Sequence, residues 1–238
     1  DFYDFFRREL ASQYGKEMEA SLNFMLEERM QLFKEISEVP VLLSVMTMAL
    51  MHSNRMPSSL YELYDMGLQN ILESQLGQVE QDVKQQLWQL MQLVALHNQL
   101  NQKRIFMQKD VESALAKEPE LLPTWTRLVQ KGDVPFVKIL ADGEDAEYQF
   151  RHLSFQEALA SQVLAESNGK MGVQAANRFK EIGGSLADFL NMPFYRNMLR
   201  IGAGFVGDVF GTYWPLTSQL TDNGRTGLWN LLLGAKKL

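Results

Sequence analysis

Apolar residues recur at spacings of three and four over most of the first half of the chain. This is the period of an amphipathic helix that buries one face. Pro40 fits a first helical turn, and Asp110 can cap a short helix that follows it. Ser59 and Glu62 have the spacing of a capping box. The pattern predicts helices over 17–36, 40–51, 59–76, 81–99, 110–116 and 123–131.

The period changes after Gly132 to the alternation that is typical of β-strands. Residues 134–140 are rich in β-branched and aromatic side chains, and residues 148–150 alternate between aromatic and polar side chains. The turn signal Asp142-Gly143 lies between these two segments. These features predict one β-hairpin, and the residues after it predict a helix over 153–166. Three helices followed by a hairpin and a further helix is the order of a winged-helix domain with one more helix behind it.

The predicted fold class is therefore mainly α. A helical subdomain (1–76) leads into a winged-helix subdomain with one β-hairpin (77–166). A helical tail (167–238) follows, as a linker or as the start of a sensor or repeat region, with helices expected near 173–181, 186–190 and 195–201.

Composition narrows the classes of function. The formal net charge is −6, with 23 basic and 29 acidic side chains, which argues against a nucleic-acid binder with a basic surface. The chain has no cysteine, which excludes disulfides and a catalytic thiol and is compatible with a reducing compartment. Its most apolar stretch, 39–51, is shorter than the roughly 20 residues of a membrane span, so no membrane partner is expected. Because the chain starts at Asp1 without an initiator methionine, we expect it to be a piece of a longer protein.

One motif indicates a family. The segment from Phe150 to Ala160, FRHLSFQEALA, resembles the signature that ends the winged-helix domain of NACHT proteins, the signal-transduction NTPases that include NOD-like receptors. An aromatic residue, a histidine and a Gln-Glu pair recur there at this spacing. Upstream, VPVLL (39–43) and LYELY (60–64) resemble the helical subdomain between the nucleotide-binding core and the winged helix. The resemblance covers about residues 1–166.

The resemblance implies a cytoplasmic switch that holds ADP and exchanges it for ATP to open and form a homo-oligomer. His152 would contact the nucleotide phosphates and Pro40 would pack near the adenine, while Arg151 and Glu157 would be interdomain switch contacts. The partners would be the protein's own nucleotide-binding core and a C-terminal sensor region. Family members often place a glycine two residues before the proline, where this chain has Glu38.

The chain departs from the family pattern because its sequence has no G-x-x-x-x-G-K-[ST] phosphate loop. Without the amides and lysine of that loop, ATP or ADP would be bound mainly by a core outside this fragment. We therefore expect no enzymatic activity from the fragment and assign no catalytic or metal-binding residue, although the longer protein could be a weak ATPase.

Simpler interpretations remain open for each site residue. His152 could be a core or capping histidine, Pro40 could simply start a helix, and Arg151 and Glu157 could be a solvated pair. The alternative function is a nucleotide-free helical scaffold that binds a partner protein through an exposed apolar face.

Other motifs are weaker. Gly202, Gly204 and Gly207 match the letters of a dinucleotide fingerprint without its strand, and small residues packed in a helix or loop explain them better. Residues 139–142 resemble a magnesium-binding strand end but follow no phosphate loop. The helix 123–131 would be the DNA-recognition helix of a winged helix, yet its only cations for phosphate contacts are Arg127 and Lys131. The wing, which is the hairpin turn over 142–147, carries four acidic residues that would repel DNA. We therefore expect no nucleic-acid partner.

Overall fold

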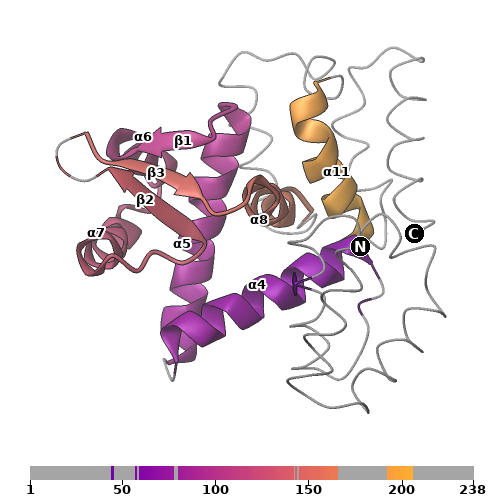
Figure 1. The fold of residues 1–238 in the computed structure, drawn as a ribbon, viewed down its shortest axis with the longest axis horizontal. Helices are drawn as coiled ribbons and strands as arrows, with labels where there is room; N and C mark the ends of the chain where they lie inside the picture. Colours follow the sequence, from indigo (N-terminus) through magenta and orange to yellow (C-terminus); the bar gives the residue numbers. More distant parts are fainter. Residues whose placement is uncertain are drawn as a thin grey trace. The chain divides into compact units, whose positions relative to one another are not determined.

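A computed structural model describes residues 44–45, 57, 59–77, 80–141, 143, 145–165 and 192–205 (Figure 1). By its internal contacts the chain divides into two compact units, residues 1–70 with Leu238, and residues 71–237. The described residues are mainly helical with one small antiparallel sheet of three strands, which confirms the predicted fold class. The predictions for 17–36, 173–181 and 186–190, and for most of 40–51, lie outside the described residues. The predicted subdomain limits at 76 and 166 stay predictions.

A helix that begins in the first unit is held by buried side chains and by a close contact between a glycine and a valine side chain. Helix α4 (Leu60–Leu76) begins after Ser59, whose Oγ accepts a hydrogen bond of 3.1 Å from the Glu62 N–H, as the capping-box spacing predicts. A Cβ built on Gly67 would lie 2.0 Å from Cγ1 of Val45, so the contact needs glycine. Helix α4 ends at Leu76 and is followed by Gly77, which has the positive φ of +62° that favours glycine.

The second unit contains a winged-helix arrangement. Its sheet has the strand order β1-β3-β2, with β3 in the centre, and both pairings are antiparallel. Helix, strand, two helices and a hairpin follow one another as α5 (Gln81–Leu100), β1 (Ile105–Met107), α6 (Gln108–Ala114), α7 (Leu122–Lys131), β2 (Val137–Ala141) and β3 (Glu147–Phe150). The hairpin and its flanking helices agree with the predicted elements to within a few residues.

Strand β1 was not predicted from the sequence pattern. It has only three residues, too few to show an alternation, and it exists because β3 pairs with it. Phe106 in β1 lies opposite Tyr148 in β3, and both side chains are buried.

An aromatic cluster fills the space between the sheet and α7. Trp125 of α7 is fully buried, and its ring centre lies 5.1 Å from that of Tyr148 and 6.2 Å from that of Phe106. Phe106 also contacts Phe150, at 5.7 Å. The Trp125 indole N–H donates a hydrogen bond of 3.0 Å to Oε1 of Gln108, so its polar atom is satisfied as well.

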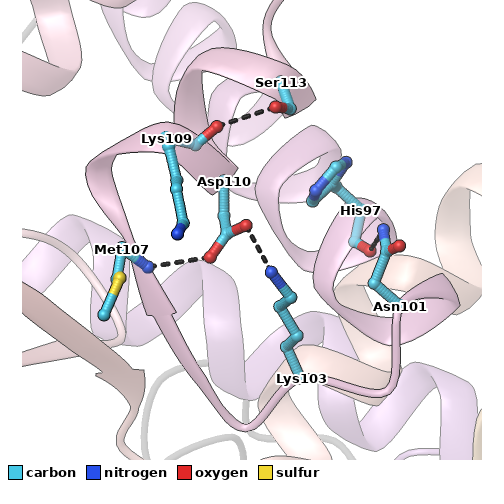
Figure 2. Close-up of polar contacts among 7 residues, drawn as sticks. All are labelled: His97, Asn101, Lys103, Met107, Lys109, Asp110 and Ser113. Atoms are coloured by element: carbon cyan, nitrogen blue, oxygen red, sulfur yellow. Dashed lines mark hydrogen bonds and ion pairs between the residues drawn. The ribbon is translucent and has the colours of Figure 1, made fainter.

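Helix α6 is capped from inside its first turn (Figure 2). The helix begins at Gln108, so the prediction that Asp110 precedes it as the cap is wrong in position. From the third helical position, Asp110 accepts hydrogen bonds from the Met107 backbone N–H (2.9 Å) and from Nζ of Lys103 (2.6 Å). Burial favours the neutral carboxyl, but these two hydrogen bonds and the Lys103 charge outweigh it and hold the pKa of Asp110 below its usual value.

We expect Asp110→Ala to lower the free energy of unfolding by about 1–2 kcal/mol at pH 7, because it removes a cap and a charge-assisted hydrogen bond. Since the pKa is lowered in the folded state, this stabilisation is complete above the unfolded pKa of about 4 and is lost as the pH falls through the folded value. Urea unfolding at pH 7 and pH 3 measures the difference. Glu112→Ala, an exposed change on the same helix, is the control, and an equal loss for both variants at pH 7 would contradict the capping role.

Helix α8 (Leu153–Ala165) packs between α5 and α11 (Pro193–Phe205). Buried glutamines join the three helices. Gln92 of α5 donates a hydrogen bond of 2.9 Å to Gln162 of α8, and Gln156 of α8 donates one of 2.9 Å to Gln99 of α5. Gln99 in turn donates to the backbone C=O of Phe194 in α11, at 3.1 Å. Directional bonds therefore fix the position of α8, in addition to apolar packing.

Candidate functional site

Arg151 and His152 form the short junction between β3 and α8, and the backbone of both is fixed. The Arg151 N–H donates a hydrogen bond of 2.7 Å to the C=O of Phe136, which continues the pairing of β3 with the start of β2. The His152 C=O accepts a hydrogen bond of 3.1 Å from the Phe155 N–H and so opens the first turn of α8. Both side chains are exposed, so the junction presents an arginine and a histidine to solvent from a rigid position.

The His152 ring rests on an aromatic support. Its centre lies 5.1 Å from that of Phe155, in an edge-on arrangement, and Phe155 is buried against Phe136. The partial burial of the ring, with the nearby charge of Lys138 as the second cause, lowers the pKa of His152. This shift favours the neutral imidazole, in which one ring nitrogen can donate a hydrogen bond and the other can accept one.

A hollow of about 720 Å³ lies beside the junction. It is lined by residues 129–132 at the end of α7, by the whole of β2 and by Arg151. Three of the lining side chains, Lys131, Lys138 and Arg151, are cationic, and none is acidic. Among the described residues, no salt bridge joins any of these three to a carboxylate. The lining of the hollow therefore carries an excess of positive side chains, which favours an anionic group.

Glu157 lies inside the helical layer. Its residue is only 6% exposed, and the carboxylate accepts a hydrogen bond from Nδ2 of Asn197 in α11. Burial raises the pKa of Glu157 to about 7, against the opposing effects of the Asn197 hydrogen bond and the charge of Arg104. The interpretation of Arg151 and Glu157 as a solvated pair is therefore wrong for Glu157. The switch roles of both residues stay predictions.

The Gln-Glu pair of the motif has a structural explanation. Gln156 bonds to Gln99 and, at 3.2 Å, to the backbone C=O of Lys103, while Glu157 bonds to Asn197 on the opposite side. The two neighbours therefore hold α8 to α5 and to α11 respectively. Gln156 was not among the predicted site residues, although a glutamine in an otherwise apolar helix segment is a signal of a buried polar contact.

The remaining candidates are not brought to this junction. Pro40, Glu38, Asp142 and Gly207 lie outside the described residues. Residues 202 and 204 are part of α11, which agrees with their interpretation as small residues in a helix. Residues 139–141 form the end of β2, where a bulge interrupts the pairing with β3.

The described part of the chain shows neither a metal-binding cluster nor a membrane-spanning helix. It holds no group of three or more His, Asp or Glu side chains that could bind a metal ion. None of its helices is both long enough and apolar enough to cross a membrane.

Lys138 is the functional candidate that the sequence pattern did not reveal. It lies on the outward face of the sheet, in line with Gln149, as the alternation along β2 would allow. Its proximity to Lys131 and Arg151 depends on how α7 packs beside β2, and the alternation along a single strand does not predict that packing.

No protein-family model matches the chain, and comparison with curated protein sequences finds no significant match. The assignment to a family therefore rests on the motif residues of this sequence itself, and it is a proposal.

Proposed function

We propose that this chain is the regulatory part of a NACHT-type nucleotide-dependent signalling switch. It contacts ADP or ATP that is held by a core outside this fragment, and it relays the state of the nucleotide to the part of the protein that follows. One observation supports this most strongly. The motif histidine, His152, lies exposed at the junction between β3 and α8 of a winged-helix arrangement, beside a cationic hollow.

The junction suits a phosphate. A neutral imidazole can donate one N–H to an anionic oxygen, and the Phe155 contact limits the positions that the ring can take. The charges of Arg151 and Lys138 favour an anion nearby without forming a closed binding site of their own. Nothing at the junction resembles a phosphate loop, so the residues can add contacts to a bound nucleotide but cannot replace the core.

The relay has a physical basis in α8. His152 directly precedes this helix, and Gln156 and Glu157 in its first two turns bond to α5 and α11. A change in the position of His152 would therefore act on α8, which is joined to α5 and α11 by hydrogen bonds. A shift of α8 would have to break or move these bonds together, which favours two discrete positions over a continuous range.

The experiment is calorimetric titration of ADP into the full-length protein and its His152→Ala variant. Losing one hydrogen bond to a charged phosphate should weaken binding about tenfold to a hundredfold, which corresponds to about 1.5–3 kcal/mol. Lys109→Ala, which removes an exposed charge from α6, is the matched control and should leave the affinity unchanged.

Two results would count against the proposal. Equal ADP affinity for a folded His152→Ala variant would remove this histidine from the phosphate site. Absence of any nucleotide binding by the full-length protein would leave the helical scaffold as the better function.

A further inference from the structure

Strand β2 is an edge strand, and its open side faces the cationic hollow. Among the strands that the structure describes, β2 pairs with β3 alone, and all five residues of β2 line the hollow. Figure 1 shows α7 beside β2, on the side away from β1. The hollow therefore lies between the end of α7 and strand β2, whose five residues extend over about 16 Å at about 3.3 Å for each residue.

Backbone groups of β2 point into this space. Because the Arg151 N–H donates to the Phe136 C=O, these two residues form a hydrogen-bonded pair of the antiparallel ladder. Hydrogen-bonded and non-hydrogen-bonded pairs alternate along such a ladder, so Ile139, opposite Tyr148, belongs to the second kind. The N–H and C=O of Ile139 therefore point away from β3 and toward the open edge.

We propose that this edge binds an extended acidic peptide, which adds as a fourth strand beside β2. Strand addition satisfies the peptide groups of the edge, and the volume of about 720 Å³ lies within the range of ligand sites. Lys131, Lys138 and Arg151 select for carboxylate side chains on the added strand. The site shares Arg151 and Lys138 with the junction, but it goes beyond the proposed nucleotide contact because it uses the β2 edge and Lys131 and not His152.

The distribution of charge favours a short peptide over nucleic acid. The wing that follows β2 has four acidic residues in positions 142–147, including the described Asp145 and Glu147. A duplex that spans the winged helix would meet this wing and be repelled, whereas a strand confined to the hollow meets the three cations. The apolar side chain of Leu140, which is 46% exposed, offers a further contact to an apolar residue between the acidic ones.

The first test uses a fluorescein-labelled hexapeptide of alternating glutamate and valine, titrated into the 238-residue protein and followed by fluorescence anisotropy. The Lys131→Glu/Lys138→Glu variant should bind it about tenfold more weakly or worse, since like charges then face each other. The control Lys109→Glu/Arg127→Glu has the same change in charge at exposed positions outside the hollow, and should bind the peptide as the unmodified protein does. Equal weakening in both variants would overturn the site.

The second test addresses the strand geometry and needs no further variant. Two versions of the peptide carry N-methyl groups on alternate residues, one on the odd and one on the even positions. Because successive N–H groups of a strand point to opposite edges, one version should lose binding and the other should keep it. Equal binding of both versions would overturn strand addition, and so would tighter binding of a DNA duplex that depends on Arg127.

Discussion

Replacing Trp125 with alanine is expected to lower the free energy of unfolding by about 3–5 kcal/mol, the largest effect of any single change considered for this protein. Trp125 is 0% exposed and contacts the rings of Tyr148 and Phe106, one from each of two paired strands. Trp125 and Leu128 are the buried residues of α7. Alanine would leave a cavity and remove one of these two anchors of the helix.

Two further variants separate the causes of this loss. Trp125→Phe keeps a ring in the core but removes the indole N–H that bonds to Gln108, so it should cost about 1–2 kcal/mol. Trp88→Ala removes a tryptophan of intermediate burial from α5, where its ring meets Phe136 edge-on at 6.2 Å, and it should cost less than Trp125→Ala. Urea unfolding followed by far-UV circular dichroism measures all three. A loss for Trp125→Ala no larger than that for Trp88→Ala would contradict the role of Trp125 as the anchor.

The same substitution has a consequence for the hollow. The end of α7 forms one wall of it, and β2 forms the other. Because the wall is held by Trp125 and Leu128, we expect the loss of Trp125 to weaken peptide binding together with stability, whereas Lys131→Glu/Lys138→Glu should weaken binding with little change in stability. Only weaker binding with unchanged stability, as expected for Lys131→Glu/Lys138→Glu, is evidence that these side chains recognise the peptide.

Much of the fold follows from local pattern. The helices α4, α5 and α7 each carry a regular apolar stripe, whereas residues 155–163 of α8 are buried on every side. Gly132 follows α7 with a φ of +68°, a position that suits glycine. The β2–β3 hairpin is also predicted from neighbouring residues alone, by the alternation of its strands and by its turn residues. Strand β1 could not be found in this way, since three residues contain no period and the strand depends on its partner β3.

The candidate site was predictable only in part. His152 and Arg151 stand out because they belong to a motif and lie between a strand and a helix. Lys131 and Lys138 are seven residues apart in different elements, and only the packing of α7 beside β2 brings them to one hollow. The burial of Glu157 was not predicted either, although Glu157 lies beside Gln156 in the same otherwise apolar helix segment, which is the signal that could have indicated it.

Glu157→Gln is expected to stabilise the protein at pH 8 by up to about 3 kcal/mol and to have little effect at pH 4. The folded pKa of about 7 lies above the ordinary value of 4.5 for this carboxyl, and each unit of difference is worth about 1.4 kcal/mol. Burial keeps the carboxyl protonated in the folded state up to about pH 7. Between these two pKa values the unfolded protein loses a proton that the folded protein retains, so the contribution to stability falls as the pH rises through this window.

Glutamine imitates the protonated carboxyl. Its amide oxygen can still accept the hydrogen bond from Nδ2 of Asn197, while no charge forms at high pH. The measurement is urea unfolding of both proteins from pH 4 to pH 8, and the quantity compared is the difference between them, because the other titrating groups are common to both and largely cancel. Glu112→Gln removes an exposed carboxylate from α6 and should give a difference that hardly depends on pH.

A second substitution tests the cause. The Asn197 hydrogen bond lowers the pKa of Glu157, so Asn197→Ala should raise that pKa further and move the loss of stability to higher pH. If the difference between Glu157→Gln and the unmodified protein stayed constant from pH 4 to pH 8, the carboxyl would not be the neutral, buried link between α8 and α11 that its contacts indicate.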